Sequence, residues 1–157
     1  MESKYDEATA YHEAGHAVVA LALDRPVAKV SIIAGREFLG VCHFQKGVSR
    51  ASIDLLEREI LIALGGIAAE ARRTGHFDRA GAGRDLRTVR KLALERVSER
   101  QLERYERRMF SKVENLLAEV ENWLAVELIA AELMKQGMIS GRAAKHLFEQ
   151  AGRKAEE

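Results

Sequence analysis

The chain has 157 residues, a length that fits one domain, because a single hydrophobic core usually serves about 100 to 200 residues. Lys and Arg total 25 against 24 Asp and Glu, so the formal net charge is +1. This balance lacks the basic excess of proteins that bind nucleic acids or anionic membranes, and we expect neither partner. The longest apolar run, residues 17–23, is far shorter than the roughly 20 residues of a membrane-spanning helix, so we expect no membrane insertion.

The N-terminus and the cysteine content both bear on location. Four of the first seven residues are charged, which leaves no apolar core for a secretory signal. The single cysteine, Cys42, cannot form an internal disulfide, which agrees with a reducing compartment. We therefore expect a cytoplasmic protein.

The first half of the chain predicts a helix, a small sheet and a second helix. Residues 3–23 are rich in alanine and contain no proline, which favours a helix that ends before Pro26. Residues 27–34 and 38–44 carry the branched and aromatic side chains of two short strands. From residue 49 the apolar spacing is helical again and continues to residue 74.

The second half predicts a loop followed by helices. Residues 74–83 contain three glycines, which are costly inside a helix, so we expect a loop there. Helical spacing resumes over residues 85–135, with a break near Ser98, and Ser140 is placed to cap a last helix. Residues 1–152 are thus expected to form one mainly α (α+β) domain with a two- to three-stranded sheet, and residues 153–157 a frayed tail.

A hydrophobic stripe repeats every seven residues in the long helical region. Its members are Leu102, Met109, Leu116 and Trp123. In a domain of this size such a stripe is usually core, although it would also serve as a surface for a partner protein.

The motif His12-Glu13-Ala14-Gly15-His16 points most directly to chemistry. Histidines four apart on a helix are rotated by about 40° from each other, so both imidazoles can reach one metal ion. Glu13 lies between them in angle, where it can contact a water on that ion without being a ligand. We interpret the motif as a zinc site with Glu13 as general base; the alternative is two structural histidines.

A catalytic zinc needs a third protein ligand and an open position for water. The candidates are Glu70, Asp85, Asp78, Asp54 and His76. Asp85 ends the predicted loop, where it could instead cap a helix, and Glu70 follows a segment of small residues that lets two helices lie close. Spacing leaves either carboxylate as the ligand and the other as a hydrogen-bond partner of a ligand histidine.

Four further blocks accompany the histidine motif in a fixed order. They are Pro26 to Ile33, Leu39-Gly40, Leu64 to Glu70 and Gly81 to Leu86. Together with the motif they resemble the peptidase domain of the FtsH family of ATP-dependent zinc metalloproteases, over residues 8–93. The resemblance implies a helical, zincin-like metallopeptidase fold that cleaves unfolded polypeptides or peptides with Zn²⁺ as cofactor.

The resemblance also assigns roles to individual residues. It implies that zinc is bound by His12, His16 and Asp85, that Glu13 is the general base, and that Glu70 supports the site. The strand of the Leu-Gly block borders the family's substrate cleft, where an extended peptide would pair by strand addition. The residues implied are Phe38, Leu39, Gly40 and Val41.

Several departures from the family pattern shape the expected function. Ile67 stands where the family usually has arginine, and Ala71 replaces an acidic residue. The chain contains no Gly-x-x-x-x-Gly-Lys-Ser/Thr loop and no membrane helix, so we expect a stand-alone peptidase domain that works with a separate ATPase or unfoldase. The alternative is a non-catalytic zinc-binding regulatory or interaction module, which a fourth ligand such as His43 or His76 would favour. A hexamer and a monomer both remain open.

Overall fold

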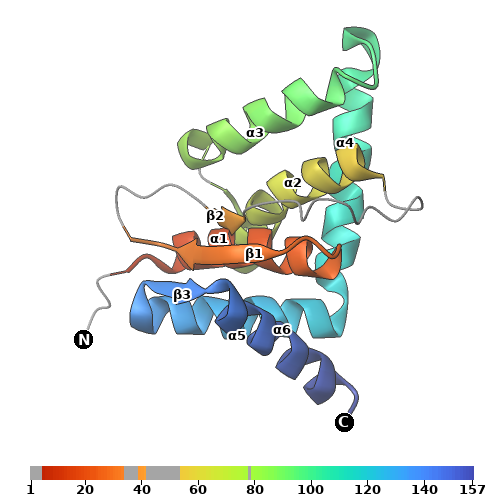
Figure 1. The fold of residues 1–157 in the computed structure, drawn as a ribbon. Coiled ribbons are helices and arrows are strands. Elements are labelled where there is room, and N and C mark those ends of the chain that lie inside the picture. The colour runs from red at the N-terminus through yellow and green to blue at the C-terminus, as the bar shows by residue number, and fades with distance from the viewer. Residues whose placement is uncertain (1–4, 34–38, 42–53, 78) are drawn as a thin grey trace.

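The computed structural model describes residues 5–33, 39–41, 54–77 and 79–157, with the backbone alone for residues 39–41 and 79–81. Within these residues it has six helices and three short strands (Figure 1). In chain order they are α1 (Glu7–Ala22), β1 (Val27–Ser31), β2 (Leu39–Val41), α2 (Leu55–Thr74), α3 (Arg79–Ala93), α4 (Glu99–Ala118), α5 (Val120–Gln136), β3 (Met138–Ser140) and α6 (Gly141–Ala155). The predicted mainly α class is confirmed.

The small sheet has the strand order β2-β1-β3, and both pairings are antiparallel. Val30 of β1 is opposite Leu39 on one side and Ile139 on the other. The third strand, β3, follows α5 directly, where the sequence predicted only the end of a helix. Within the described residues the outer edge of β2 carries no further strand.

Helices α1 and α2 cross at van der Waals contact of their backbones. A Cβ atom added to Gly15 would lie 2.3 Å from the carbonyl oxygen of Gly65, and one added to Gly65 would lie 2.9 Å from the carbonyl oxygen of Gly15. Only glycine allows so close an approach at both positions. The crossing brings the histidine-bearing face of α1 directly onto α2.

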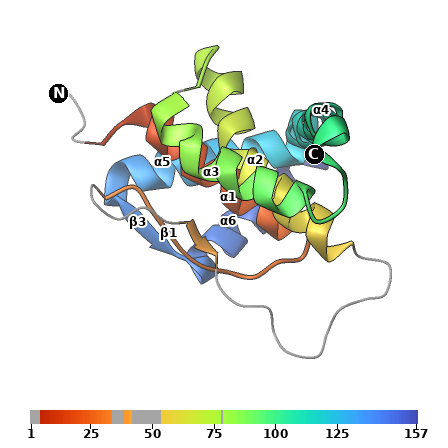
Figure 2. The ribbon, with the colours of Figure 1, turned by 90° about the horizontal axis from the view of Figure 1, so that it is seen from above.

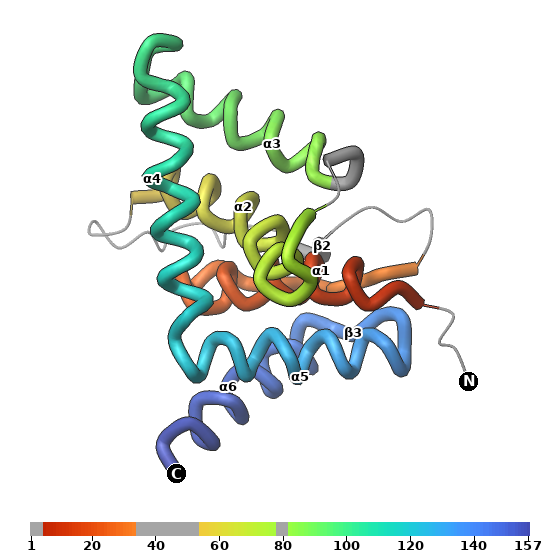
Figure 3. The backbone as a smooth tube through the Cα atoms, turned by 180° about the vertical axis from the view of Figure 1, so that it is seen from behind, coloured from red at the N-terminus to blue at the C-terminus, as the bar shows by residue number. Residues whose placement is uncertain are grey.

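The long helical region is divided into three helices. The predicted break near Ser98 is confirmed, because Ser98 is the N-cap of α4. A second break was not predicted: Glu119 is extended, with φ −65° and ψ 133°, and α5 leaves α4 at a steep angle (Figure 3). The side-chain amide of Asn122 donates to the carbonyl oxygen of Leu116 at 2.9 Å and so satisfies the end of α4.

The corner between α4 and α5 corrects the prediction of one continuous stripe. Met109 is 1% exposed and is buried with the other inward residues of α4, whereas Trp123 lies on α5 with its ring 5.8 Å from that of Tyr11 on α1. The stripe is therefore shared between two faces of the core and does not form a continuous partner surface.

The core surrounds α1, which contacts α2, α5 and β1. Its largest fully buried side chains are Ile60, Ile67, Met109, Leu117, Ile129 and Leu133. Helix α6 runs to Ala155, so the end of the chain stays helical beyond residue 153, where fraying was expected. Among the described residues, none of the helices is both long and apolar enough to cross a bilayer.

Candidate metal centre

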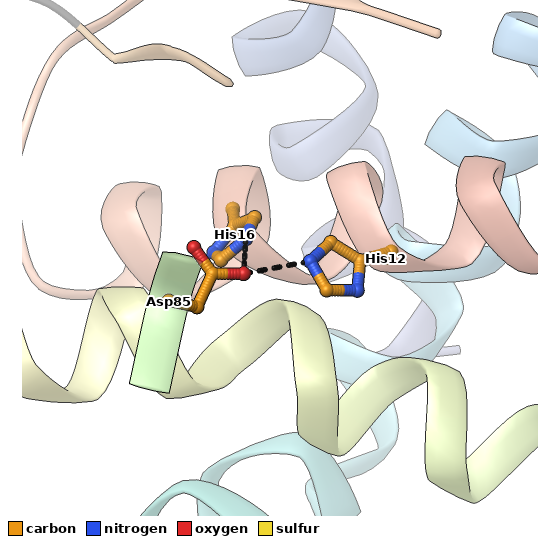
Figure 4. A group of neighbouring side chains, drawn as sticks. All are labelled: His12, His16 and Asp85. Carbon is orange, nitrogen blue, oxygen red and sulfur yellow. Dashed lines mark hydrogen bonds and ion pairs between the residues drawn. The ribbon is translucent and has the colours of Figure 1, made fainter. Parts of the chain in front are cut away.

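His12 and His16 lie one turn apart on α1, and both rings turn toward α2 and α3. Their centroids are 4.8 Å apart and the rings are nearly perpendicular, at 75°. The Nε2 atom of His12 is 2.8 Å from Oδ2 of Asp85, and the Nε2 atom of His16 is 3.2 Å from the same oxygen (Figure 4). The three donor atoms thus converge on one point and lie within 4.8 Å of one another.

The opposite nitrogen of each ring is held by α2. Nδ1 of His12 is 2.9 Å from Oε1 of Glu70, and Nδ1 of His16 is 2.7 Å from the carbonyl oxygen of Ile62. A carbonyl oxygen can only accept, so Nδ1 of His16 carries a proton and donates it. In the neutral ring the lone pair is then on Nε2, which faces Asp85, and this is the usual support of a metal-binding histidine.

Gly66 leaves the space that the two rings occupy. A Cβ atom at this position would lie 2.5 Å from Nε2 of His16 and 2.7 Å from Nε2 of His12. The sequence indicated that the Gly65-Gly66 pair marks either close helix packing or a ligand. The structure gives the two glycines different neighbours: Gly65 faces α1, and Gly66 faces the histidine rings.

The charges of the three converging residues are strongly coupled. Burial lowers the pKa of His16, but the hydrogen bond to Asp85 and the negative charges of Asp85 and Glu13 outweigh burial and raise the pKa to about 9. Burial acts in the opposite sense on Asp85, yet its hydrogen bonds to His12 and His16 hold the pKa of Asp85 well below the usual range. The site therefore favours positive charge between the imidazoles and the carboxylate, which a proton or a metal cation can supply.

Glu13 contributes a buried carboxylate with an unused oxygen. Its Oε2 atom is buried and has no hydrogen-bond partner among the described residues. Burial raises the pKa of Glu13, while the nearby His16 and His12 act in the opposite direction. A buried acceptor without a partner usually indicates a water or ligand that completes it.

Asp85 reaches the site from inside a helix, which corrects two expectations. Helix α3 begins at Arg79, so the predicted loop was wrong from that residue onward, and Asp85 is not an N-cap. The physical reason is packing: Ala82 is 1% exposed and Val89 is fully buried, so burial of one face of α3 outweighs the cost of its glycines.

The other candidates for a third ligand lie elsewhere. Asp54 is the N-cap of α2, where it accepts from the backbone N–H of Glu57 at 3.0 Å and forms an ion pair with Arg96. His76 is exposed just beyond α2. Asp78 and His43 are outside the described residues. Within the part of the chain that the structure describes, His12, His16 and Asp85 form the one group of three His, Cys, Asp or Glu side chains spaced for a metal ion.

The predicted substrate strand lies beside this centre. Leu39, Gly40 and Val41 form β2, which contacts α1, while Phe38 is outside the described residues. Figure 1 shows β3, β1 and β2 rising in that order toward α3, so the edge of β2 that has no further strand among the described residues lies on the side of the helix that carries Asp85.

One contact at the centre could not be found by sequence reasoning. The carbonyl of Ile62 orients His16, but a main-chain acceptor leaves no mark in the sequence because every residue has one. The only available signal was the neighbouring segment of small residues, which indicated close packing of α2.

Comparisons with known proteins find similarity in the first two thirds of this chain. A family model described as peptidase family M41 matches residues 1–103. ATP-dependent zinc metalloprotease FtsH 4 of Sorangium cellulosum is 38% identical over 96 residues, which are 58% of this chain and 15% of that protein. The ATP-dependent zinc metalloprotease FtsH of Magnetococcus marinus is 40% identical over 97 residues, 59% of this chain and 14% of the relative.

A third relative extends the same match. The ATP-dependent zinc metalloprotease FtsH of Chlamydia trachomatis serovar L2 is 33% identical over 103 residues, 63% of this chain and 11% of that protein. The family model's match, residues 1–103, includes the two histidines and Asp85. The matched segments span less than a sixth of the length of each relative.

Proposed function

This chain belongs to peptidase family M41, and we propose from that premise that it is a zinc-dependent endopeptidase that cleaves unfolded polypeptides or peptides. The observation that carries the proposal is the convergence of two histidine Nε2 atoms on a single Asp85 oxygen. The unpartnered carboxylate oxygen of Glu13 in the same motif adds a base. Two histidines, a carboxylate and a separate glutamate are the parts that a metallopeptidase needs.

The residues present fit a zinc ion. Nitrogen and carboxylate oxygen are common zinc donors, and three protein ligands leave the fourth position open to water. Bonds of about 2.0 to 2.1 Å in a tetrahedral site place donor atoms about 3.3 Å apart. The separations of 2.8 Å and 3.2 Å between the Asp85 oxygen and the two imidazole nitrogens are close to that spacing. His12, His16 and Asp85 would hold the ion, with Glu70 accepting from His12.

The mechanism follows from the positions of the chain's own groups. A zinc ion bound there supplies a Lewis acid for the scissile carbonyl and makes the attacking water more acidic. Glu13 accepts the proton of that water and later passes it to the leaving amine. Glu70 and the Ile62 carbonyl keep the two imidazoles in the tautomer that presents Nε2.

The outer edge of β2, which pairs with no further strand among the described residues, supports a preference for extended substrates. A peptide that pairs with Leu39–Val41 must offer its backbone N–H and C=O groups, which a folded protein keeps in its own hydrogen bonds. We therefore propose that the substrates are unfolded chains or short peptides. The relatives are named as ATP-dependent, and this supports the proposal that an ATPase or unfoldase supplies the substrates. The single Cys42 supports a cytoplasmic location.

The alternative of a non-catalytic module loses its structural support. A long helical stripe would have served that module as a partner surface, but Leu102 and Met109 are buried in the core. A fourth protein ligand would also have favoured the module, and no fourth side chain joins the metal-spaced group among the described residues, which do not include His43. A purely structural ion would give Glu13 no role.

The test is a Glu13→Gln variant assayed on an unfolded, fluorescently labelled polypeptide. We expect cleavage to fall by about 10²- to 10⁴-fold, because Gln cannot accept the proton, while bound zinc stays unchanged. Glu149→Gln, an exposed glutamate of α6, is the matched control and should cleave like wild type. Cleavage by Glu13→Gln at the wild-type rate would overturn the proposal.

A further inference from the structure

Helix α3 presents an unusually basic sequence to the surface beside the metal centre. It contains five basic residues and a single acidic one, Asp85, in a chain whose net charge is only +1. Asp85 points inward to the histidines. The charge of α3 is therefore not offset on the helix itself.

The basic residues form a stripe with a defined direction. Arg84, Arg87 and Lys91 are spaced i, i+3 and i+7, which puts them within about 60° of one another on a helix. They lie about 100° to 160° around the helix from Asp85. All three are exposed, and we call them the α3 basic stripe.

Two cations of the stripe, Arg87 and Lys91, are not used to join elements of the described fold. Among the described residues, no carboxylate lies within ion-pairing distance of Arg87 or Lys91. By contrast Arg90, on another face of α3, lies 3.7 Å from Glu106 of α4, and Arg96, just beyond α3, pairs with Asp54. Arg90 and Arg96 therefore join elements of the fold, whereas Arg87 and Lys91 are exposed and have no such carboxylate among the described residues.

The position of α3 relates the stripe to the proposed substrate path. Seen from above, α3 lies over α1 (Figure 2), and in Figure 1 the outer edge of β2, which has no further strand among the described residues, lies on the side of α3. A Cβ atom at Gly83 would lie 3.3 Å from Nη1 of Arg87, so the Arg87 guanidinium lies back along the helix toward its first turns. Those turns precede Asp85 in the chain.

The distance from the metal centre to the α3 basic stripe determines which substrate residues can reach the stripe. The outer face of a helix is about 10 to 12 Å from its inner face with side chains included. An extended peptide advances about 3.3 Å per residue, so a side chain three to five residues from the scissile bond covers that distance. We propose that the α3 basic stripe binds acidic side chains there, and that the enzyme prefers extended polypeptides with Asp or Glu at those positions. This inference rests on the proposed function.

Two features favour an acidic peptide over a nucleic acid. Arg87 and Lys91 place two cations about 6 Å apart along the helix, which matches two carboxylates of a peptide. Nucleic-acid binding by charge usually involves six to ten phosphate contacts and a broader basic surface. The near-neutral charge of the whole chain gives no such surface.

The first experiment compares quenched-fluorescence peptides that differ only in two residues placed three to five positions before or after the scissile bond. On one side of the scissile bond, a peptide with two Glu residues should be cleaved with a kcat/KM about three- to tenfold higher than the same peptide with two Gln residues, at low salt. The difference should lie mainly in KM. The preference should disappear near 1 M salt, where charges are screened within about 3 Å. The double variant Arg87→Gln/Lys91→Gln should lose the preference for the Glu peptide. The control double variant Arg142→Gln/Lys145→Gln on α6 should retain it.

The second experiment measures binding without cleavage. Fluorescence anisotropy should show that the Glu13→Gln protein binds the acidic peptide more tightly than the neutral one. Adding Arg87→Gln/Lys91→Gln to this protein should remove the difference. Equal binding of both peptides, or equal effects of the two double variants, overturns the inference. Tighter binding of a 12-nucleotide single-stranded DNA than of the acidic peptide would also overturn the inference. If wild type cleaves no reporter while the binding preference holds, the proposed function fails and the stripe stands.

Discussion

The substitution Gly66→Ala should disturb the metal centre much more than the fold that carries it. The added Cβ would meet Nε2 of His16 at 2.5 Å and Nε2 of His12 at 2.7 Å, whereas ordinary contact begins at 3.4 Å. The rings must therefore withdraw by about 0.7 to 0.9 Å, and metal sites tolerate only about 0.2 Å in their bond lengths. Both proposed nitrogen ligands are displaced by one methyl group.

The effect on stability should be much smaller than the effect on the metal. Alanine in a helix interior is favoured over glycine by up to about 1 kcal/mol, and overpacking costs about 1 to 3 kcal/mol. The free energy of unfolding of the metal-free protein should therefore fall by about 0 to 2 kcal/mol. Zinc affinity should fall by at least about 100-fold, the upper range seen for disturbed ligand support.

Two other glycines provide the controls for Gly66→Ala. Gly152→Ala has nothing within 4 Å of its Cβ and should be neutral or slightly stabilising, with normal zinc binding. Gly15→Ala places its Cβ 2.3 Å from a backbone oxygen and should destabilise the fold by more than about 3 kcal/mol. Urea unfolding and zinc competition with a chelator measure the two quantities. Wild-type zinc affinity in Gly66→Ala would refute the assignment of this pocket.

Three further predictions address pH, ligand assignment and the core. Zinc affinity should rise about tenfold per pH unit between pH 6 and 8. The raised pKa of about 9 keeps His16 protonated in this range, so zinc must displace a proton to bind. A chelator titration that shows no change of zinc affinity with pH would contradict this. Glu70→Gln should weaken zinc binding by about 10- to 100-fold and Asp85→Asn should abolish it by metal analysis, so the reverse ranking would exchange their roles. Met109→Ala should cost about 2 to 5 kcal/mol by urea unfolding, whereas Val120→Ala, 70% exposed, should stay within about 0.5 kcal/mol; equal effects would contradict the core assignment.

The histidine pair could be predicted because its geometry is local. Four residues on a helix return nearly to the same face, so His12 and His16 converge whatever surrounds them. The choice between Glu70 and Asp85 could not be made this way, since it depends on how α2 and α3 lie against α1. In the structure Asp85 meets the Nε2 atoms and Glu70 meets Nδ1 of His12.

The parts of the fold that the sequence missed depend on tertiary contacts. Strand β3 has three residues, too few for a periodic pattern, and it is defined by its pairing with β1. The corner at Glu119 contains no proline or glycine to mark it, and Asn122 caps the end of α4 instead. The glycine-rich segment is helical because Ala82 is buried. In each case packing overrides local preference.

Each of the three helices at the metal centre supplies a different part of it. Helix α1 supplies both imidazoles, and α2 supplies their orientation through Glu70, the Ile62 carbonyl and the space above Gly66. Helix α3 supplies only Asp85 to the donor set, and it contacts α2 and α4 through a narrow buried face. A cation at the centre would therefore join α3 to α1 by charge, in addition to the packing of α3 on α2 and α4. Because the basic stripe lies on the same helix, metal binding would also restrict the movement of the stripe, and the proposed substrate selection would then depend on an assembled metal centre.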